Sequence, residues 1–225
     1  MPGSDRRTAA GVLALLLATV SPACAEPDPV VGRWRAAEGP EMASQLELTA
    51  DGRFRYMLSY GALDEEAQGR WSRTGTLVGL TTEPQPKPSA ILLDSLSPTE
   101  RDGAALFLIV RGPGDPMGKG IAGIDFRIEF DSGDPVEGYT QDYGWQADNL
   151  AGRTPLWVQL FEPIHGISSD RIAIPRGTRA MEFRFEVNDL GIADFRATPV
   201  LAEGDQLTLM HRMGTLHYRR VKPGD

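Results

Sequence analysis

Two histidines and a methionine near the C-terminus are the strongest candidates for metal chemistry. His211 and His217 lie in one segment of alternating apolar and polar residues, with Met213 between them. A hairpin that turned at residues 213–215 would place the two histidines opposite each other, about 5 Å apart. Imidazole and thioether groups together favour Cu(I). A competing register with a two-residue turn gives the better hydrophobic pattern, because it gathers four apolar residues on one face: Leu207, Leu209, Leu216 and Tyr218.

Hydrolytic chemistry has weaker support. There is no Gly-x-Ser-x-Gly motif, and the glycine-rich segment 112–120 lacks the spacing of a phosphate-binding loop. The acidic runs Asp64–Glu66 and Asp131–Asp134 are best interpreted as a solvated loop and a turn. We therefore predict a non-enzymatic protein without a cofactor. The alternative is a hydrolase that uses an acid pair or a histidine in a cleft between modules.

Three aromatic residues are the candidates for ligand binding. Tyr139, Tyr143 and Trp145 fall in a polar, glycine-containing stretch. Exposed aromatic side chains in such a stretch would form a recognition patch. The alternative is that they pack in the core or in turns, which is the common fate of large aromatic residues.

Alternating apolar and polar residues predict the elements that must position these side chains. Residues 46–58 form a hairpin pattern around the turn Asp51-Gly52, and residues 181–187 show the clearest period of two. Glycine and proline are spread between many short runs of this kind, as strands joined by turns require. The predicted fold class is all-β.

The order of these runs predicts two modules. A proline-rich spacer at residues 83–88 and a glycine-rich segment at 112–123 interrupt the pattern. We place the first module at residues 26–104, with closing strands from 201–225, and a second, inserted module at 105–200.

The N-terminus has the three parts of a secretory signal peptide. Two arginines precede the uncharged apolar run 9–20, and Ala23–Ala25 supplies the small residues that favour cleavage before Glu26. The run is shorter than the about 20 apolar residues of a bilayer span. We expect residues 1–25 to be removed and the protein to be periplasmic or secreted, not an integral membrane protein. A lipid anchor on Cys24 is the alternative.

The overall charge bears on partners. A formal net charge of −8 argues against nucleic acid, because phosphate binding requires clustered Lys and Arg. The same net charge disfavours an anionic membrane surface. A small apolar ligand or an envelope protein is the expected partner.

The first module resembles the lipocalin-like small barrels of exported bacterial proteins. The resemblance rests on two Gly-x-Trp motifs, the hairpin at 46–58 and a closing strand: Gly32–Trp34, Gly69–Trp71 and Leu216–Val221. It implies an antiparallel barrel closed at one end by Trp34, with Arg219 or Arg220 across the ring, and with Trp71 as a second structural tryptophan.

The inserted part resembles transthyretin-like or carboxypeptidase-regulatory sandwiches through residues 136–144, which implies a binding or spacer module. Together these features predict an exported, non-enzymatic binding or interaction protein of the bacterial envelope, holding a small apolar ligand or an envelope component. A structural envelope factor and a copper-binding protein are further alternatives.

Overall fold

The computed structural model describes residues 28–36, 40–101, 103–113 and 118–222. The predicted signal peptide, residues 1–25, lies outside this range. The described residues form seventeen strands and no helix, so the all-β prediction is confirmed. In this part of the chain there is accordingly no helix with the length and apolar character of a membrane span.

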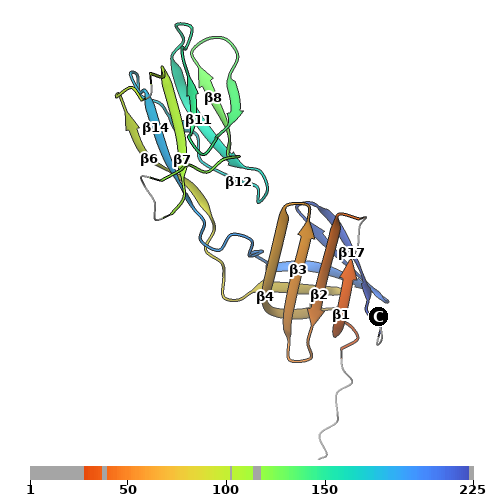
Figure 1. The fold of residues 1–225 in the computed structure, drawn as a ribbon. Helices are drawn as coiled ribbons and strands as arrows, with labels where there is room; N and C mark the ends of the chain where they lie inside the picture. Colours follow the sequence, from red (N-terminus) through yellow and green to blue (C-terminus); the bar gives the residue numbers. More distant parts are fainter. Residues whose placement is uncertain (1–27, 37–39, 102, 114–117, 223–225) are drawn as a thin grey trace, which may run out of the picture.

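Eight antiparallel strands close into a barrel in the order β1-β17-β16-β15-β5-β4-β3-β2 (Figure 1). The barrel combines the first five strands of the chain with the last three. Their bounds are β1 Gly32–Ala36, β2 Met42–Leu48, β3 Arg53–Tyr60, β4 Leu63–Thr74, β5 Leu77–Thr82, β15 Arg196–Glu203, β16 Gln206–His211 and β17 Gly214–Arg220.

The barrel interior is filled by side chains. Alternate residues of each strand point inward, since successive side chains of a strand lie on opposite faces. They form one buried cluster whose largest members are almost fully inaccessible to solvent: Trp34, Leu46, Leu48, Phe54, Tyr56, Leu80 and Tyr218. Eight strands enclose a space just wide enough for such a core.

One barrel end is closed by a tryptophan and an arginine. The guanidinium carbon of Arg220 lies 4.3 Å from the centre of the Trp34 ring, a cation–π contact. Arg220 Nη1 donates to the Val31 carbonyl over 2.8 Å, and Trp34 Nε1 donates to the Val30 carbonyl over 2.9 Å. Arg219 instead points outward. Trp71, half-buried, donates from Nε1 to the Thr49 carbonyl over 3.0 Å.

The remaining nine strands form two sheets around a second core. One sheet has the order β10-β7-β14-β6, in which β7 and β14 are parallel. The other has the order β12-β11-β8-β9, with β13 also paired to β11. Their bounds are β6 Ala90–Ser97, β7 Leu106–Arg111, β8 Asp125–Phe130, β9 Val136–Tyr139, β10 Trp145–Ala147, β11 Pro155–Glu162, β12 Ile167–Ser168, β13 Ile172–Ala173 and β14 Ala180–Glu186.

The division between the two units differs from the predicted boundary at 104/105 and 200/201. Strand β6 pairs with β14 in the second unit, and β15 pairs with β5 in the barrel. The chain therefore crosses between the units at residues 83–89 and 187–195. Proline-rich chain is extended and cannot supply every ladder amide, so the spacer at 83–88 marks the first crossing.

Candidate binding site

Two adjoining hollows lie on the outer wall of the barrel, where β3 and β4 meet the crossing segments. Their volumes are about 440 and 600 Å³, and both are lined by Met57, Glu66 and Ile192. We call them together the wall groove. Its other walls come from residues 43–45 of β2 and from the crossing segments at 83–86 and 189–192.

The groove exists because residues 63–68 of β4 do not pair with β5. The β4–β5 ladder runs from Gly69 to Thr74 on the β4 side. Beyond it, the second crossing segment takes the free edge of β4: Glu66 N donates to the Gly191 carbonyl over 2.9 Å, and Ala193 N donates to the Glu66 carbonyl over 2.8 Å. The crossing segment therefore forms a raised wall beside the strands.

The two crossing segments are tied to each other. Lys87 N donates to Asp189 Oδ2 over 2.7 Å, and Asn188 Nδ2 donates to the Pro88 carbonyl over 2.8 Å. These bonds fix the wall that faces Met57. The groove is thus built from hydrogen-bonded backbone rather than from a free loop.

Met57 forms the apolar centre of the groove. Its side chain is 60% exposed, although it lies in the middle of β3. On the inner face, Ser44 Oγ donates to the Met57 carbonyl over 2.7 Å and lies 2.7 Å from Tyr218 Oη. The backbone under the exposed methionine is therefore held in place from inside the barrel.

A cluster of polar side chains joins the barrel to the second unit. Glu65 Oε2 lies 2.7 Å from His211 Nε2, and Arg212 Nη2 donates to Glu65 Oε1 over 3.0 Å. Burial alone would raise the pKa of the Glu65 carboxyl, but the hydrogen bonds from His211 and Arg212 outweigh it and hold that pKa below its ordinary value. Glu65 is thus an ionised carboxylate, and each of its oxygens has a hydrogen-bond partner.

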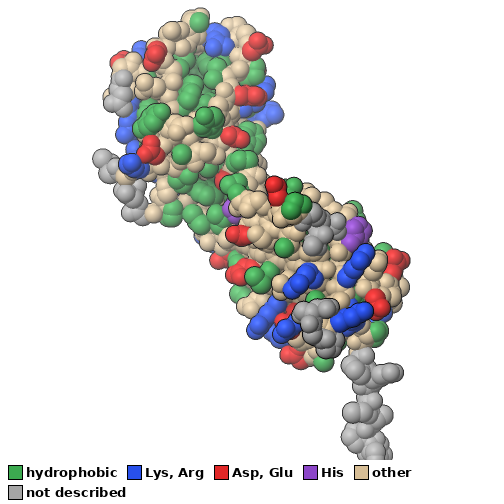
Figure 2. All heavy atoms as spheres, turned by 45° about the vertical axis from the view of Figure 1, so that its right-hand side comes forward, with side chains coloured by type: hydrophobic (Ala, Val, Ile, Leu, Met, Phe, Trp, Pro, Cys, Tyr) green, Lys and Arg blue, Asp and Glu red, His purple; other side chains and the backbone are tan. Residues whose placement is uncertain are grey.

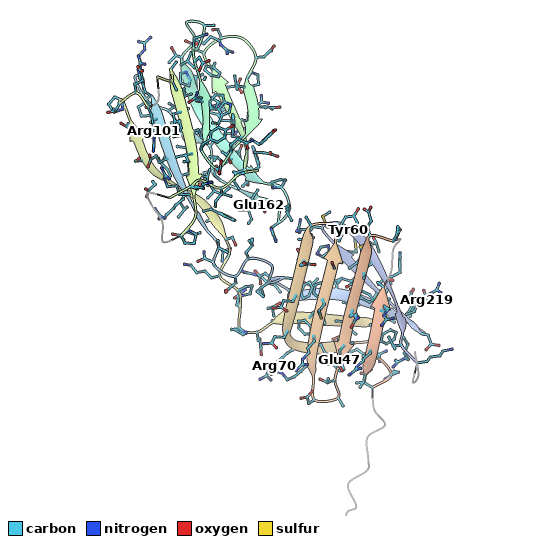
Figure 3. All side chains as sticks on the ribbon, in the orientation of Figure 1. Glu47, Tyr60, Arg70, Arg101, Glu162 and Arg219 are labelled. Atoms are coloured by element: carbon cyan, nitrogen blue, oxygen red, sulfur yellow. The ribbon has the colours of Figure 1, made fainter. Side chains whose placement is uncertain are left out.

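Arg212 also reaches across to the second unit. Its Nη2 donates to the Ile164 carbonyl over 3.1 Å. The loop that carries Ile164 is held by the buried Glu162, which accepts from Ile164 N over 3.1 Å and from His165 N over 2.8 Å. Figure 3 shows Glu162 at the end of the second unit that faces the barrel. We call these contacts the Arg212 joint.

A smaller hollow of about 190 Å³ lies beside the Arg212 joint and is lined by Glu65, His165 and Asp189. A general acid in such a cleft needs a raised pKa. Glu65 has the opposite shift, and His165 Nδ1 is 3.1 Å from the Glu162 carboxylate. The pKa of Glu65 is therefore shifted away from the range of a general acid.

The two histidines of the predicted metal site point to different faces. His211 pairs with Gly214 and Thr208 pairs with His217, so the turn is made by Arg212 and Met213. This register puts His211 inward against Glu65, and His217 outward with its Nδ1 3.4 Å from Thr208 Oγ1. Within the described ranges, no group of three or more His, Cys, Asp and Glu side chains is arranged to hold a metal ion.

The three aromatic residues predicted to bind ligand differ in their exposure to solvent. Tyr139 and Tyr143 are 59% and 73% exposed. Trp145 instead packs against Phe126, with 4.8 Å between the ring centres, as part of the second core. Two of the three residues are therefore available at the surface, and the third is structural.

Met57, Glu65 and Arg212 are not among the predicted site residues, whereas His211 is predicted as a metal ligand. Glu65 was interpreted as part of a solvated loop, whereas it lies in β4 between the inward-facing Leu63 and Ala67. The alternation of residues 63–71 between inward and outward positions indicates a strand with Glu65 on its inward face. Met57 stands out in the sequence as an apolar residue at an outward position of the 46–58 hairpin.

Comparison of the chain with models of known families, with curated proteins and with solved structures found no match.

Proposed function

We propose that this is an exported, non-enzymatic binding protein that holds its ligand in the wall groove. The observation that carries the proposal is the groove itself: adjoining hollows of about 440 and 600 Å³ around a methionine that is 60% exposed. Hollows of a few hundred Å³ with an apolar floor and a few polar groups are typical of small-molecule sites.

The groove favours a ligand with an apolar body. Met57 forms the floor, and Ile192 and the ring of Pro84 add apolar walls. Methionine adapts its shape to different partners, since its side chain is unbranched and polarizable. A small apolar molecule, or an apolar segment of an envelope component, fits this lining.

The barrel wall is a better candidate than the barrel interior. A lipocalin-like relation is supported by the eight-stranded antiparallel barrel and by the contact of Arg220 with Trp34. Ligand-holding barrels of that kind keep an internal cavity. Here the inward side chains pack into one buried cluster, so we place the ligand outside it. The second unit, transthyretin-like in our proposal, serves as a binding or spacer module.

The proposal is tested by native mass spectrometry of the chain purified from the envelope of the producing cell. We expect a bound mass, or binding of palmitate added to the bare protein. Met57→Gln should lose it, because an amide in the groove floor removes apolar contact. Met210→Gln is the matched control, since Met210 is 78% exposed on β16, outside the groove.

Wild-type protein that is bare from the envelope and stays bare with palmitate contradicts the proposal. Equal binding by the Met57→Gln and wild-type proteins contradicts the assignment to the groove.

A further inference from the structure

The outer face of β17, β1 and β3 is rich in arginine. Arg219 points outward from β17, Arg33 and Arg35 from β1, and Arg53 and Arg55 from β3, and all five are exposed. We call these five residues the arginine face. Figure 2 shows Lys and Arg side chains gathered on the barrel.

The register places Arg35 beside Arg219, while Glu47 of β2 lies between Arg33 and Arg55. Arg35 is the direct partner of Arg219 across β1 and β17, and Arg53 is the direct partner of Arg70 across β3 and β4. Neighbouring strands are about 4.8 Å apart. Like charges directly opposite each other on one face of a sheet are destabilising. The Arg35–Arg219 pair is thus a cross-strand repulsion that a bound anion would relieve, whereas Arg70 already pairs with Glu83 over 2.9 Å.

Acidic side chains balance little of this charge. Among the outward positions of β17, β1, β2 and β3, the acidic residue is Glu47, which pairs with Arg33 over 3.2 Å. Arg35, Arg55 and Arg219 form no ion pair with the described residues. Arg53 lies near Asp51, whose pKa is lowered by a hydrogen bond from Thr49 and also by the charge of Arg53. The face is therefore strongly positive although the whole chain has a net charge of −8.

The arginine face also contains a hollow. A depression of about 310 Å³ is lined by Arg33, Arg35 and Arg55, together with Glu47 and Gln45. Guanidinium groups recognise phosphate through two parallel hydrogen bonds, which ammonium groups cannot form. The volume of the hollow exceeds that of a phosphate group, and Arg35 and Arg55 on its lining are free of the Glu47 carboxylate that pairs with Arg33.

The position of the face on the molecule indicates an extended surface as partner. The first described residue, Asp28, is bound to Arg73, and Arg220 donates to the carbonyls of Pro29 and Val31, so the chain enters the barrel beside β1. Figure 3 shows Arg70, Glu47 and Arg219 on the parts of the barrel away from the second unit. An anionic surface can therefore approach the outer faces of β17 and β1 from the side away from the second unit.

We propose that the arginine face docks the protein on a bilayer surface through the phosphate groups of anionic lipids. Arginines next to such a surface each strengthen binding, and the effect falls off within a Debye length. The arginine face borders the wall groove, since Arg55 lines one hollow of the groove and Met57 lines the hollow of the arginine face.

The test is co-sedimentation of the chain from Glu26 onward, which keeps every described residue, with vesicles of phosphatidylglycerol and phosphatidylcholine. We expect binding to mixed vesicles at low salt, and its loss in high salt or with phosphatidylcholine alone. Replacing Arg35, Arg53 and Arg219 by Gln should weaken binding about 100-fold. The matched control replaces three exposed cations of the second unit by Gln: Lys119, Arg171 and Arg176.

The proposal is overturned by wild-type protein that ignores anionic vesicles, or by equal losses in the two triple variants. Tighter binding of soluble polyphosphate or of a single-stranded oligonucleotide than of vesicles, at equal phosphate, also overturns it. Circular dichroism of each variant establishes that the fold is retained. Palmitate binding should be unchanged in the arginine variant, which separates this result from that of the groove.

Discussion

Glu65 Oε2 and His211 Nε2 lie 2.7 Å apart, although 146 positions separate the two residues in the chain. Both side chains are almost completely buried, at 10% and 7% exposure. The contact joins β4 to the end of β16 and orients Arg212, which holds the second unit. The contact therefore stabilises the end of the barrel from which Arg212 reaches the second unit.

Replacing Glu65 by Gln should lower the free energy of unfolding at pH 7 by about 3 kcal/mol, since it removes one partner of a buried ionic cluster. The groups that face Glu65 are His211, Arg212 and Tyr56. Urea unfolding measures the effect. Glu66→Gln is the control, because Glu66 points outward from the same strand, and it should change the unfolding free energy by less than about 0.5 kcal/mol.

The Glu65 contribution should depend on pH in a defined direction. Its pKa in the folded protein lies below the ordinary value of 4.5. A depressed pKa stabilises the fold fully above the unfolded value, and this stability is lost as pH falls through the folded pKa. The difference between wild type and Glu65→Gln should therefore shrink below about pH 4.5. A difference that grows in acid contradicts this account.

Removing the Arg212 side chain should loosen the joint between the units. Arg212→Ala loses the bond to the Ile164 carbonyl as well as the bonds to Glu65. We expect faster proteolysis at the crossing segments and a wider distribution of dimensions in small-angle scattering. Arg33→Ala, which breaks an ion pair with Glu47 on the barrel, serves as the comparison. Identical scattering from the two variants would show that Arg212 does not hold the units.

Arg220 and Arg219 are neighbours with opposite environments, and this makes them a matched pair. Arg220→Ala removes the contact with Trp34 and leaves two backbone carbonyls without their donor. We expect a loss of about 2 kcal/mol in unfolding free energy. Arg219→Ala should be nearly neutral, because its side chain is exposed and its Cα partner is another arginine, Arg35. Tryptophan fluorescence during urea unfolding distinguishes the two.

The sequence was most informative where a residue pattern is typical of a single local structure. Alternation and the Asp51-Gly52 turn predicted the β2–β3 hairpin, and the strand pair forms in that place. The repeated Gly-x-Trp motif marked β1 and the middle of β4, whose tryptophans contact the barrel core. Such local patterns are read directly from residue order.

Other features depend on parts of the chain that are distant in sequence. The edge of β4 at Glu66 is completed by residues 191–193, which no local pattern predicts. For the β16–β17 hairpin, the register with a two-residue turn correctly gathers four apolar residues inside the barrel: Leu207, Leu209, Leu216 and Tyr218. The turn itself lies at Arg212–Met213, one residue earlier than Met213-Gly214. Net charge was likewise a poor guide to local charge, because the arginine face appears only when β17, β1 and β3 are brought together.

The most direct test of the central claim is an NMR measurement of intermolecular NOEs between methyl-labelled protein and a bound apolar ligand such as palmitate. We predict NOEs from the ligand to the Met57 and Ile192 methyl groups, which line both hollows of the groove. NOEs to the inward methyl groups of Leu46 and Leu209, without any to Met57, would place the ligand inside the barrel and contradict the account.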